Sequence, residues 1–167
     1  EAETEDTRPF RILEPEDVQP YVNALPCFDV KVAAGAFSPE QWIEDCQWIE
    51  PPEHIAIRKG YFVAQVIGES MNQRIPNGSW CLFKANPAGS REGKIVLVQH
   101  REIQDPAYAG SFTIKSYYSE KVATDEGWQQ QKIVLQPRSI NPEFSDLVFN
   151  SDTLQDLQIV GEFVAVL

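Results

Sequence analysis

The sequence predicts a mainly β fold, and three observations carry that prediction. Short apolar runs rich in β-branched and aromatic residues recur along the chain, turns containing glycine or proline separate them, and helical periodicity is scarce. This pattern is typical of a rolled or half-barrel sheet. We expect one domain over residues 25–167 and an irregular arm or linker over residues 1–24. The runs expected to form strands are 61–67, 80–83, 95–98, 112–118, 132–135 and 159–167.

The N-terminal quarter of the chain is predicted to be less regular. Prolines and acidic residues interrupt residues 1–24, so that only 16–25 could hold a short helical turn. Residues 25–32 alternate loosely between apolar and polar side chains, which predicts a strand that ends in the small-residue loop Ala33-Ala34-Gly35-Ala36. The mixed stretch 38–53 contains aromatic residues that we expect to cover the core. The small-residue loop could present its backbone to a groove.

Charge and hydropathy exclude several classes of function. With Lys+Arg 14 against Asp+Glu 25, the net charge of −11 opposes the counterion release that draws proteins onto nucleic acid. The sequence also contains neither a signal-peptide pattern nor an apolar run near the length of a membrane span. We therefore expect a soluble cytoplasmic protein that binds neither DNA nor a membrane through this segment.

The cysteines and histidines do not form a recognisable metal or redox site. Cys27, Cys46 and Cys81 are odd in number, widely spaced and lack a C-x-x-C pair, so we expect reduced and mostly packed thiols. His54 and His100 stand beside charged or turn-forming residues, which favours two surface histidines over members of a catalytic triad. No metal or cofactor is expected.

A serine follows the 61–67 run in the turn Gly68-Glu69-Ser70-Met71. Glycine permits a tight turn, and nearby backbone N–H groups could then point at one oxygen atom. This is the local arrangement that an acyl-transfer nucleophile requires. Ser70 still needs a base to take its proton.

A lysine within a predicted strand could be that base. Lys115 lies in Phe112-Thr113-Ile114-Lys115, and burial would lower its pKa from the model value of about 10.4 towards neutrality. The alternative is a solvated lysine on an edge strand, where most strand lysines belong. Taken alone, Lys115 fits that alternative better.

Several motifs taken together resemble the LexA/UmuD-type self-cleaving serine peptidases of the signal-peptidase-like clan. They occur in the order and approximate spacing of that family. The motifs are Leu25-Pro26 through Ala34-Gly35, Val66-Ile67-Gly68-Glu69-Ser70-Met71, Ile75-Pro76-Asn77-Gly78, Gly93-Lys94-Ile95-Val96 and Phe112-Thr113-Ile114-Lys115. The resemblance covers roughly residues 25–167. Asn77-Gly78-Ser79 stands where members often have Asp-Gly-Asp, which puts any contact of those acidic residues in doubt.

The resemblance implies a LexA-like rolled β-sheet domain in which Ser70 attacks and Lys115 is the general base. It also implies that the loop carrying Ala34-Gly35 folds into the domain's own cleft, with the oxyanion held by the backbone N–H groups of Glu69 to Met71. A homodimer and an activating protein such as a RecA-DNA filament are further implications. The first 24 residues cannot supply the three-helix DNA-reading domain of a repressor.

We therefore hypothesise a serine autopeptidase that cleaves its own Ala34–Gly35 bond as a regulatory switch in a stress, DNA-damage or phage-related response. The alternative is a non-proteolytic dimerisation or docking module of a larger protein that keeps the same fold. Cleavage of other proteins is disfavoured because the sequence provides no membrane anchor.

Overall fold

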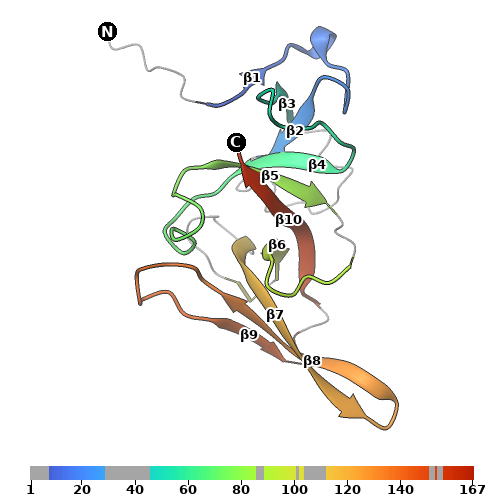
Figure 1. Ribbon diagram of the computed structural model, residues 1–167, viewed down its shortest axis with the longest axis vertical. Helices are drawn as coiled ribbons and strands as arrows, with labels where there is room; N and C mark the ends of the chain where they lie inside the picture. Colours follow the sequence, from blue (N-terminus) through green and yellow to red (C-terminus); the bar gives the residue numbers. More distant parts are fainter. Residues whose placement is uncertain are drawn as a thin grey trace.

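A computed structural model describes residues 8–28, 46–85, 89–100, 102–103, 112–150, 153 and 156–167. Its strands form one sheet along the long axis of the molecule (Figure 1), which confirms the mainly β prediction. The sheet order is β1-β3-β2-β4-β5-β10-β6-β7-β8-β9. These strands are β1 (Arg11–Ile12), β2 (Leu25–Phe28), β3 (Gln47–Glu50), β4 (Tyr61–Gln65), β5 (Trp80–Ala85), β6 (Ile95–Gln99), β7 (Phe112–Thr124), β8 (Gly127–Gln136), β9 (Leu147–Asn150) and β10 (Gln158–Val166).

The central strands are continuous apolar runs because both of their faces are covered. Three successive residues of β4, Phe62 to Ala64, are buried, and four successive residues of β6, Ile95 to Val98, are buried as well. A strand that is buried on both faces has no reason to alternate apolar and polar side chains. The core divides into three clusters of packed side chains along the sheet.

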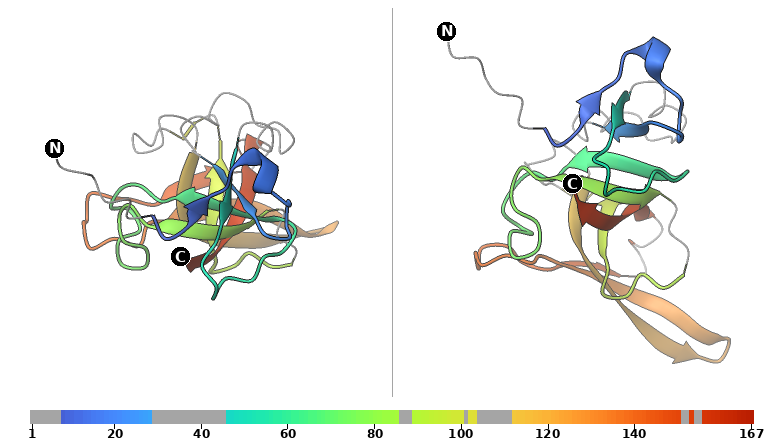
Figure 2. Two further views of the ribbon diagram at one scale, coloured as in Figure 1. Left: turned by 90° about the horizontal axis from the view of Figure 1, so that it is seen from above. Right: turned by 45° about the horizontal axis from the view of Figure 1, so that its top comes forward.

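Strand β10 joins the two halves of the sheet. It pairs antiparallel with β5 on one side and with β6 on the other, and its register shifts in both pairings. Such irregularities bend a strand and increase its twist. The strand direction accordingly changes between the β4–β5 end and the β7–β9 end (Figure 2).

Three strands lie outside the runs predicted from the sequence, and β7 and β8 are much longer than predicted. β1 lies in the predicted arm, and β3 lies within the mixed stretch 38–53 and pairs with β1 and β2. β9 pairs with β8, and β7 continues to Thr124 in a hairpin that projects from the body (Figure 1). β1, β3 and β9 span only two to four residues, and the hairpin exposes charged residues such as Glu120 and Lys121, so these segments carry little strand signal in the sequence.

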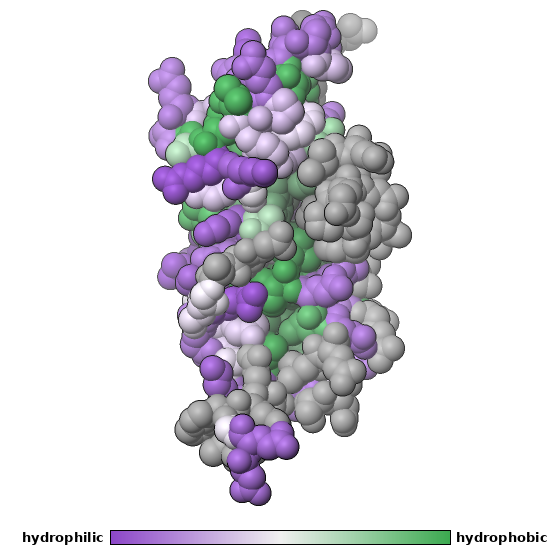
Figure 3. All heavy atoms as spheres, turned by 90° about the vertical axis from the view of Figure 1, so that its right-hand side faces the viewer, coloured by the Kyte–Doolittle hydropathy of each residue, from purple (hydrophilic) through white to green (hydrophobic). Residues whose placement is uncertain are grey.

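The N-terminal part of the described chain adds a short edge to the sheet. β1 pairs with β3, and the 3-10 turn η1 (Pro15–Asp17) follows it. The only parallel strand pair among the described residues joins β2 to β4. Figure 3 shows a band of apolar residues along the middle of one face, with hydrophilic residues along its left border. No helix in the described ranges has the length and apolar character needed to span a bilayer.

Candidate active site

Ser70 begins a single helical turn just after β4. The turn is closed by hydrogen bonds from the N–H groups of Arg74 and Ile75 to the carbonyl of Met71, at 2.9 and 2.8 Å. Met71 and Ile75 are 1% and 0% exposed, respectively, so this turn is anchored by apolar side chains in the core. Ser70 is therefore held by a packed element of the fold.

Gly68 allows the chain to enter this turn. Its φ of 96° lies in the region that non-glycine residues rarely adopt. Its N–H donates to the side-chain oxygen of Asn77 at 2.8 Å. The chain around Asn77 is fastened to the end of β4 by bonds between Gly78 N and Val66 O and between Val66 N and Ser79 O, both 2.8 Å. Asn77 thus makes a site contact that sequence reasoning left in doubt.

Lys115 is buried within the sheet. It lies on β7, opposite Val96 of β6, and β7 pairs with β8 on its other side. Because β7 is an interior strand and Lys115 is only 5% exposed, the alternative of a solvated lysine on an edge strand is wrong. The sheet removes this amine from water.

The structure brings Ser70 and Lys115 into direct contact. Lys115 Nζ lies 3.0 Å from Ser70 Oγ, 2.6 Å from Thr113 Oγ1 and 3.1 Å from the carbonyl oxygen of Ile114. Ser70 and Thr113 are 9% and 1% exposed. Thr113 and Lys115 share one face of β7, as the alternation of a strand requires. Sequence reasoning did not identify Thr113 as a partner of the amine.

Ser70 and Lys115 line a cleft of about 260 Å³. Apolar side chains form much of its wall, and two carboxylates also line it. Beside Ser70, Thr113 and Lys115, the lining residues are Glu102, Ile103, Glu143, Phe144, Ser145, Leu147 and Phe149. The cleft offers room for a peptide segment with small side chains next to the serine hydroxyl.

His100 supports the wall of this cleft from within and is not the surface residue expected from the sequence. It is 1% exposed, and its ring lies 4.6 Å from that of Phe149. Its Nδ1 accepts a 3.0 Å bond from Glu102 N, and its Nε2 lies 2.8 Å from Thr153 O. One neutral tautomer satisfies both partners, because the carbonyl requires a donor and the amide requires an acceptor. His54 is exposed, as expected.

The loop after β8 holds the serine turn from the other side. Arg138 N donates to Ser70 O at 2.8 Å, and Gln73 N donates to Arg138 O at 2.9 Å. Ile140 N also donates to the Asn72 side-chain oxygen at 3.1 Å. Nothing in the sequence of this loop marks it as part of a site, because it acts mainly through its backbone.

Of the remaining predicted site residues, the structure describes the proposed oxyanion donors but not the proposed cleavage site. In the described ranges, the N–H groups of Glu69, Ser70 and Met71 donate no backbone hydrogen bond, whereas those of Asn72 to Ile75 all do. The first N–H groups of a helical turn have no partner within it, which leaves them able to bind an oxyanion. Ala34 and Gly35 lie outside the described residues.

The three cysteines are thiols and form no disulfide, as predicted. Cys27 and Cys81 are buried and Cys46 is partly buried. Burial raises the pKa of the Cys81 thiol to about 12. These thiols are therefore packing residues, and Cys81 in particular is a poor nucleophile.

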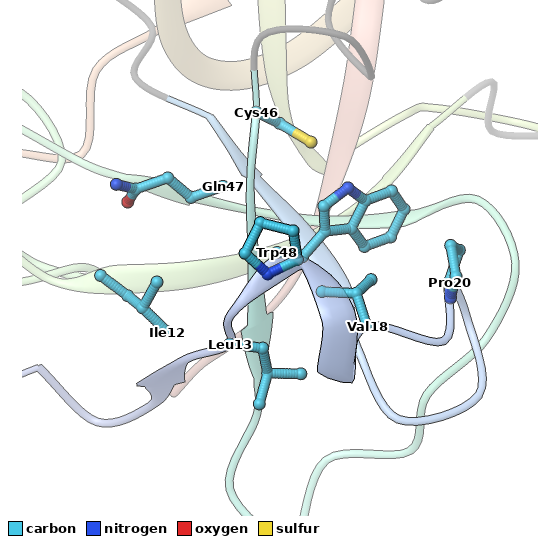
Figure 4. A pocket seen from close by; sticks show the side chains of 8 residues that line it. Ile12, Leu13, Val18, Pro20, Cys46, Gln47 and Trp48 are labelled. Carbon is cyan, nitrogen blue, oxygen red and sulfur yellow. The ribbon is translucent and has the colours of Figure 1, made fainter.

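A second hollow lies near the N-terminal end of the sheet (Figure 4). Its volume is about 460 Å³, and its lining is mostly apolar. The residues that line it are Ile12, Leu13, Pro15, Val18, Pro20, Cys46, Gln47 and Trp48. Among the described residues, it shares no lining residue with the Ser70 cleft and contains neither a carboxylate nor a basic side chain.

The comparison with family models matches residues 26–164 to the Peptidase S24-like family. This chain belongs to that family. The match covers β3 to β9 completely and all but the ends of β2 and β10, so it includes both elements that meet at Ser70 and Lys115. No curated protein matches the chain. The predicted resemblance to LexA/UmuD-type peptidases is confirmed at the level of the family.

Proposed function

We propose that the protein is a serine autopeptidase in which Ser70 is the nucleophile and Lys115 the general base, acting on the Ala34–Gly35 bond. The observation that carries the proposal is the 3.0 Å separation of Lys115 Nζ and Ser70 Oγ inside a lined cleft. A base must lie within hydrogen-bond reach of the proton that it removes.

The oxygen atoms of described residues that lie next to Lys115 Nζ can all bind a neutral amine. The carbonyl of Ile114 can only accept a hydrogen bond, whereas the hydroxyls of Thr113 and Ser70 can donate or accept. A neutral amine has two N–H donors and one lone pair. It can donate to Ile114 O and Thr113 Oγ1 and accept the hydrogen of Ser70. That hydrogen is the one that catalysis must transfer.

Burial affects the protonation of this amine. Lys115 is only 5% exposed, and burial disfavours the charged form of an amine. The base is the neutral form, and its fraction increases with pH. The proposed cleavage should therefore accelerate as the pH rises.

The reaction follows from these positions. Ser70 Oγ attacks the carbonyl carbon of Ala34 while its proton passes to Lys115 Nζ, and the backbone N–H groups of Glu69 to Met71 stabilise the oxyanion. The C–N bond then breaks as Lys115 returns the proton to the amine of Gly35. Water, deprotonated by Lys115, hydrolyses the acyl-enzyme and regenerates Ser70.

The family resemblance also implies a cellular role for the cleavage. Cleavage would act as a regulatory switch in a stress, DNA-damage or phage-related response. The protein would work as a homodimer, with a partner such as a RecA-DNA filament favouring the cleavable state. Binding energy from such a partner would raise the population of the conformation in which the loop occupies the cleft.

The test is self-cleavage of the purified protein over a series of rising pH values, followed by intact-mass measurement of the fragments. We expect fragments ending at Ala34 and beginning at Gly35, formed faster at higher pH. Ser70→Ala and Lys115→Ala should abolish them. Lys84→Ala is the matched control, because Lys84 is an exposed lysine on β5. Equal cleavage by the parent and by Ser70→Ala would refute the assignment.

A further inference from the structure

We propose that Arg138 is a positioning residue that sets the separation of Ser70 and Lys115. This inference rests on the proposed function. Arg138 makes hydrogen bonds on both sides of this pair. Its backbone binds the turn that carries Ser70, and its side chain binds β7, which carries Lys115. Sequence reasoning gave this arginine no role.

The backbone of Arg138 fixes the serine end. Its N–H donates to the carbonyl of Ser70 itself at 2.8 Å, and its own carbonyl accepts from Gln73 N at 2.9 Å. These two bonds clamp the helical turn at its first and fourth residues. The clamp is local to the nucleophile and does not depend on the identity of the side chain at position 138.

The side chain of Arg138 fixes the lysine end. Its Nε donates to Ser116 Oγ at 3.1 Å, and a terminal nitrogen contacts the Tyr118 hydroxyl. The guanidinium carbon also lies 5.6 Å from the centroid of the Tyr118 ring. Ser116 directly follows Lys115 and is 2% exposed. The arginine side chain therefore binds β7 at the residue next to the proposed base.

The topology explains why such a link is needed. Ser70 lies in a turn after β4, whereas Lys115 lies on β7, which pairs with β6 and β8 and not with β4. Within the sheet, β5, β10 and β6 separate β4 from β7, so no direct strand pairing fixes the two side chains relative to each other. Arg138 lies two residues after the end of β8 and contacts both the turn and the strand, so its loop bridges them. A misplacement of about 1 Å at a reacting centre can cost about 100-fold in rate.

Arginine suits this position better than lysine. Ser116 and Tyr118 are two residues apart and so lie on the same face of β7. A planar guanidinium presents several N–H groups in a fixed fork and can bind both hydroxyls at once, whereas an ammonium is a single point. We therefore expect a lysine at this position not to bind both hydroxyls at once, so that Arg138→Lys slows self-cleavage.

The test compares Arg138→Gln and Arg138→Lys with Arg74→Gln. Arg74 is an exposed arginine on the serine turn itself, so this control removes the same charge from the same neighbourhood. We expect both Arg138 variants to self-cleave roughly 10- to 100-fold more slowly than the parent at every pH, and Arg74→Gln to match the parent. The backbone clamp should keep all three variants folded, as monitored by thermal unfolding.

A crystal structure of Arg138→Gln supplies a readout that does not depend on activity. The expected result is a Lys115 Nζ to Ser70 Oγ distance beyond hydrogen-bond range, above about 3.5 Å. An unchanged distance, or cleavage at the parent rate, overturns the positioning role. If the parent itself does not cleave, the proposed function fails, and the distance in the variant still decides the role of Arg138. Should Arg138→Gln not fold, Ser116→Ala combined with Tyr118→Phe removes the same contacts and is judged by the same two measurements.

Discussion

Gly161 lies where β10 meets both halves of the sheet, and replacing it with alanine should destabilise the protein. A Cβ at this position would lie 2.7 and 2.9 Å from two ring carbons of Phe62. Phe62 cannot easily move aside: it is 3% exposed, stacks on Phe83 at 5.4 Å and contacts Phe28 edge-on at 5.5 Å. The added methyl group therefore overpacks the core beneath the sheet.

The magnitude follows from two opposing terms. Overpacking a well-packed core costs about 1–3 kcal/mol. Replacing glycine with alanine recovers about 0.4–1 kcal/mol, because the unfolded chain loses freedom. We therefore expect Gly161→Ala to lower the free energy of unfolding by about 1–2 kcal/mol, which for a chain of this size lowers Tm by roughly 2–8 °C.

The assay is urea unfolding monitored by circular dichroism for a double-mutant cycle. Phe62→Leu removes both ring atoms that the new methyl group would contact, so Gly161→Ala should cost much less in that background. The remaining neighbour, Lys84 O at 3.4 Å, is close to ordinary contact distance. If Gly161→Ala is as stable as the parent, or costs the same in both backgrounds, the packing argument is refuted.

Two further predictions concern the serine turn and a buried thiol. Gly68→Ala should destabilise the fold by about 1–3 kcal/mol and slow self-cleavage, because alanine is strained at a φ of 96°; parent-like urea unfolding would contradict this. Cys81 should contribute stability that is fully present below pH 9 and is lost as the pH rises towards about 12, because burial raises its pKa from 9.0 to about 12. Between about pH 9 and pH 11, the parent should therefore lose about 2 kcal/mol more than Cys81→Ala in urea unfolding, and parallel losses would rule out this titration.

The sequence alone determined the fold class and the identity of the residues that meet. Short apolar runs separated by turns define the central strands, because these strands are buried on both faces and need a continuous apolar composition. Ser70 and Lys115 were recognisable because a glycine turn and a threonine–lysine strand occur together. Taken alone, Lys115 fitted an exposed edge better, since a sequence does not reveal which strand is interior.

The tertiary structure decided how deeply these residues are buried and which groups they contact. Pairing of β7 with β6 and contact with the serine turn bury Lys115, and neither is visible in the local sequence. His100 is buried because distant partners, Thr153 and Phe149, satisfy its ring, and Arg138 reaches Ser70 and Ser116 through long-range hydrogen bonds. Local propensity reports a residue's immediate neighbours along the chain, whereas burial and hydrogen bonding at this site depend on segments that only folding brings together.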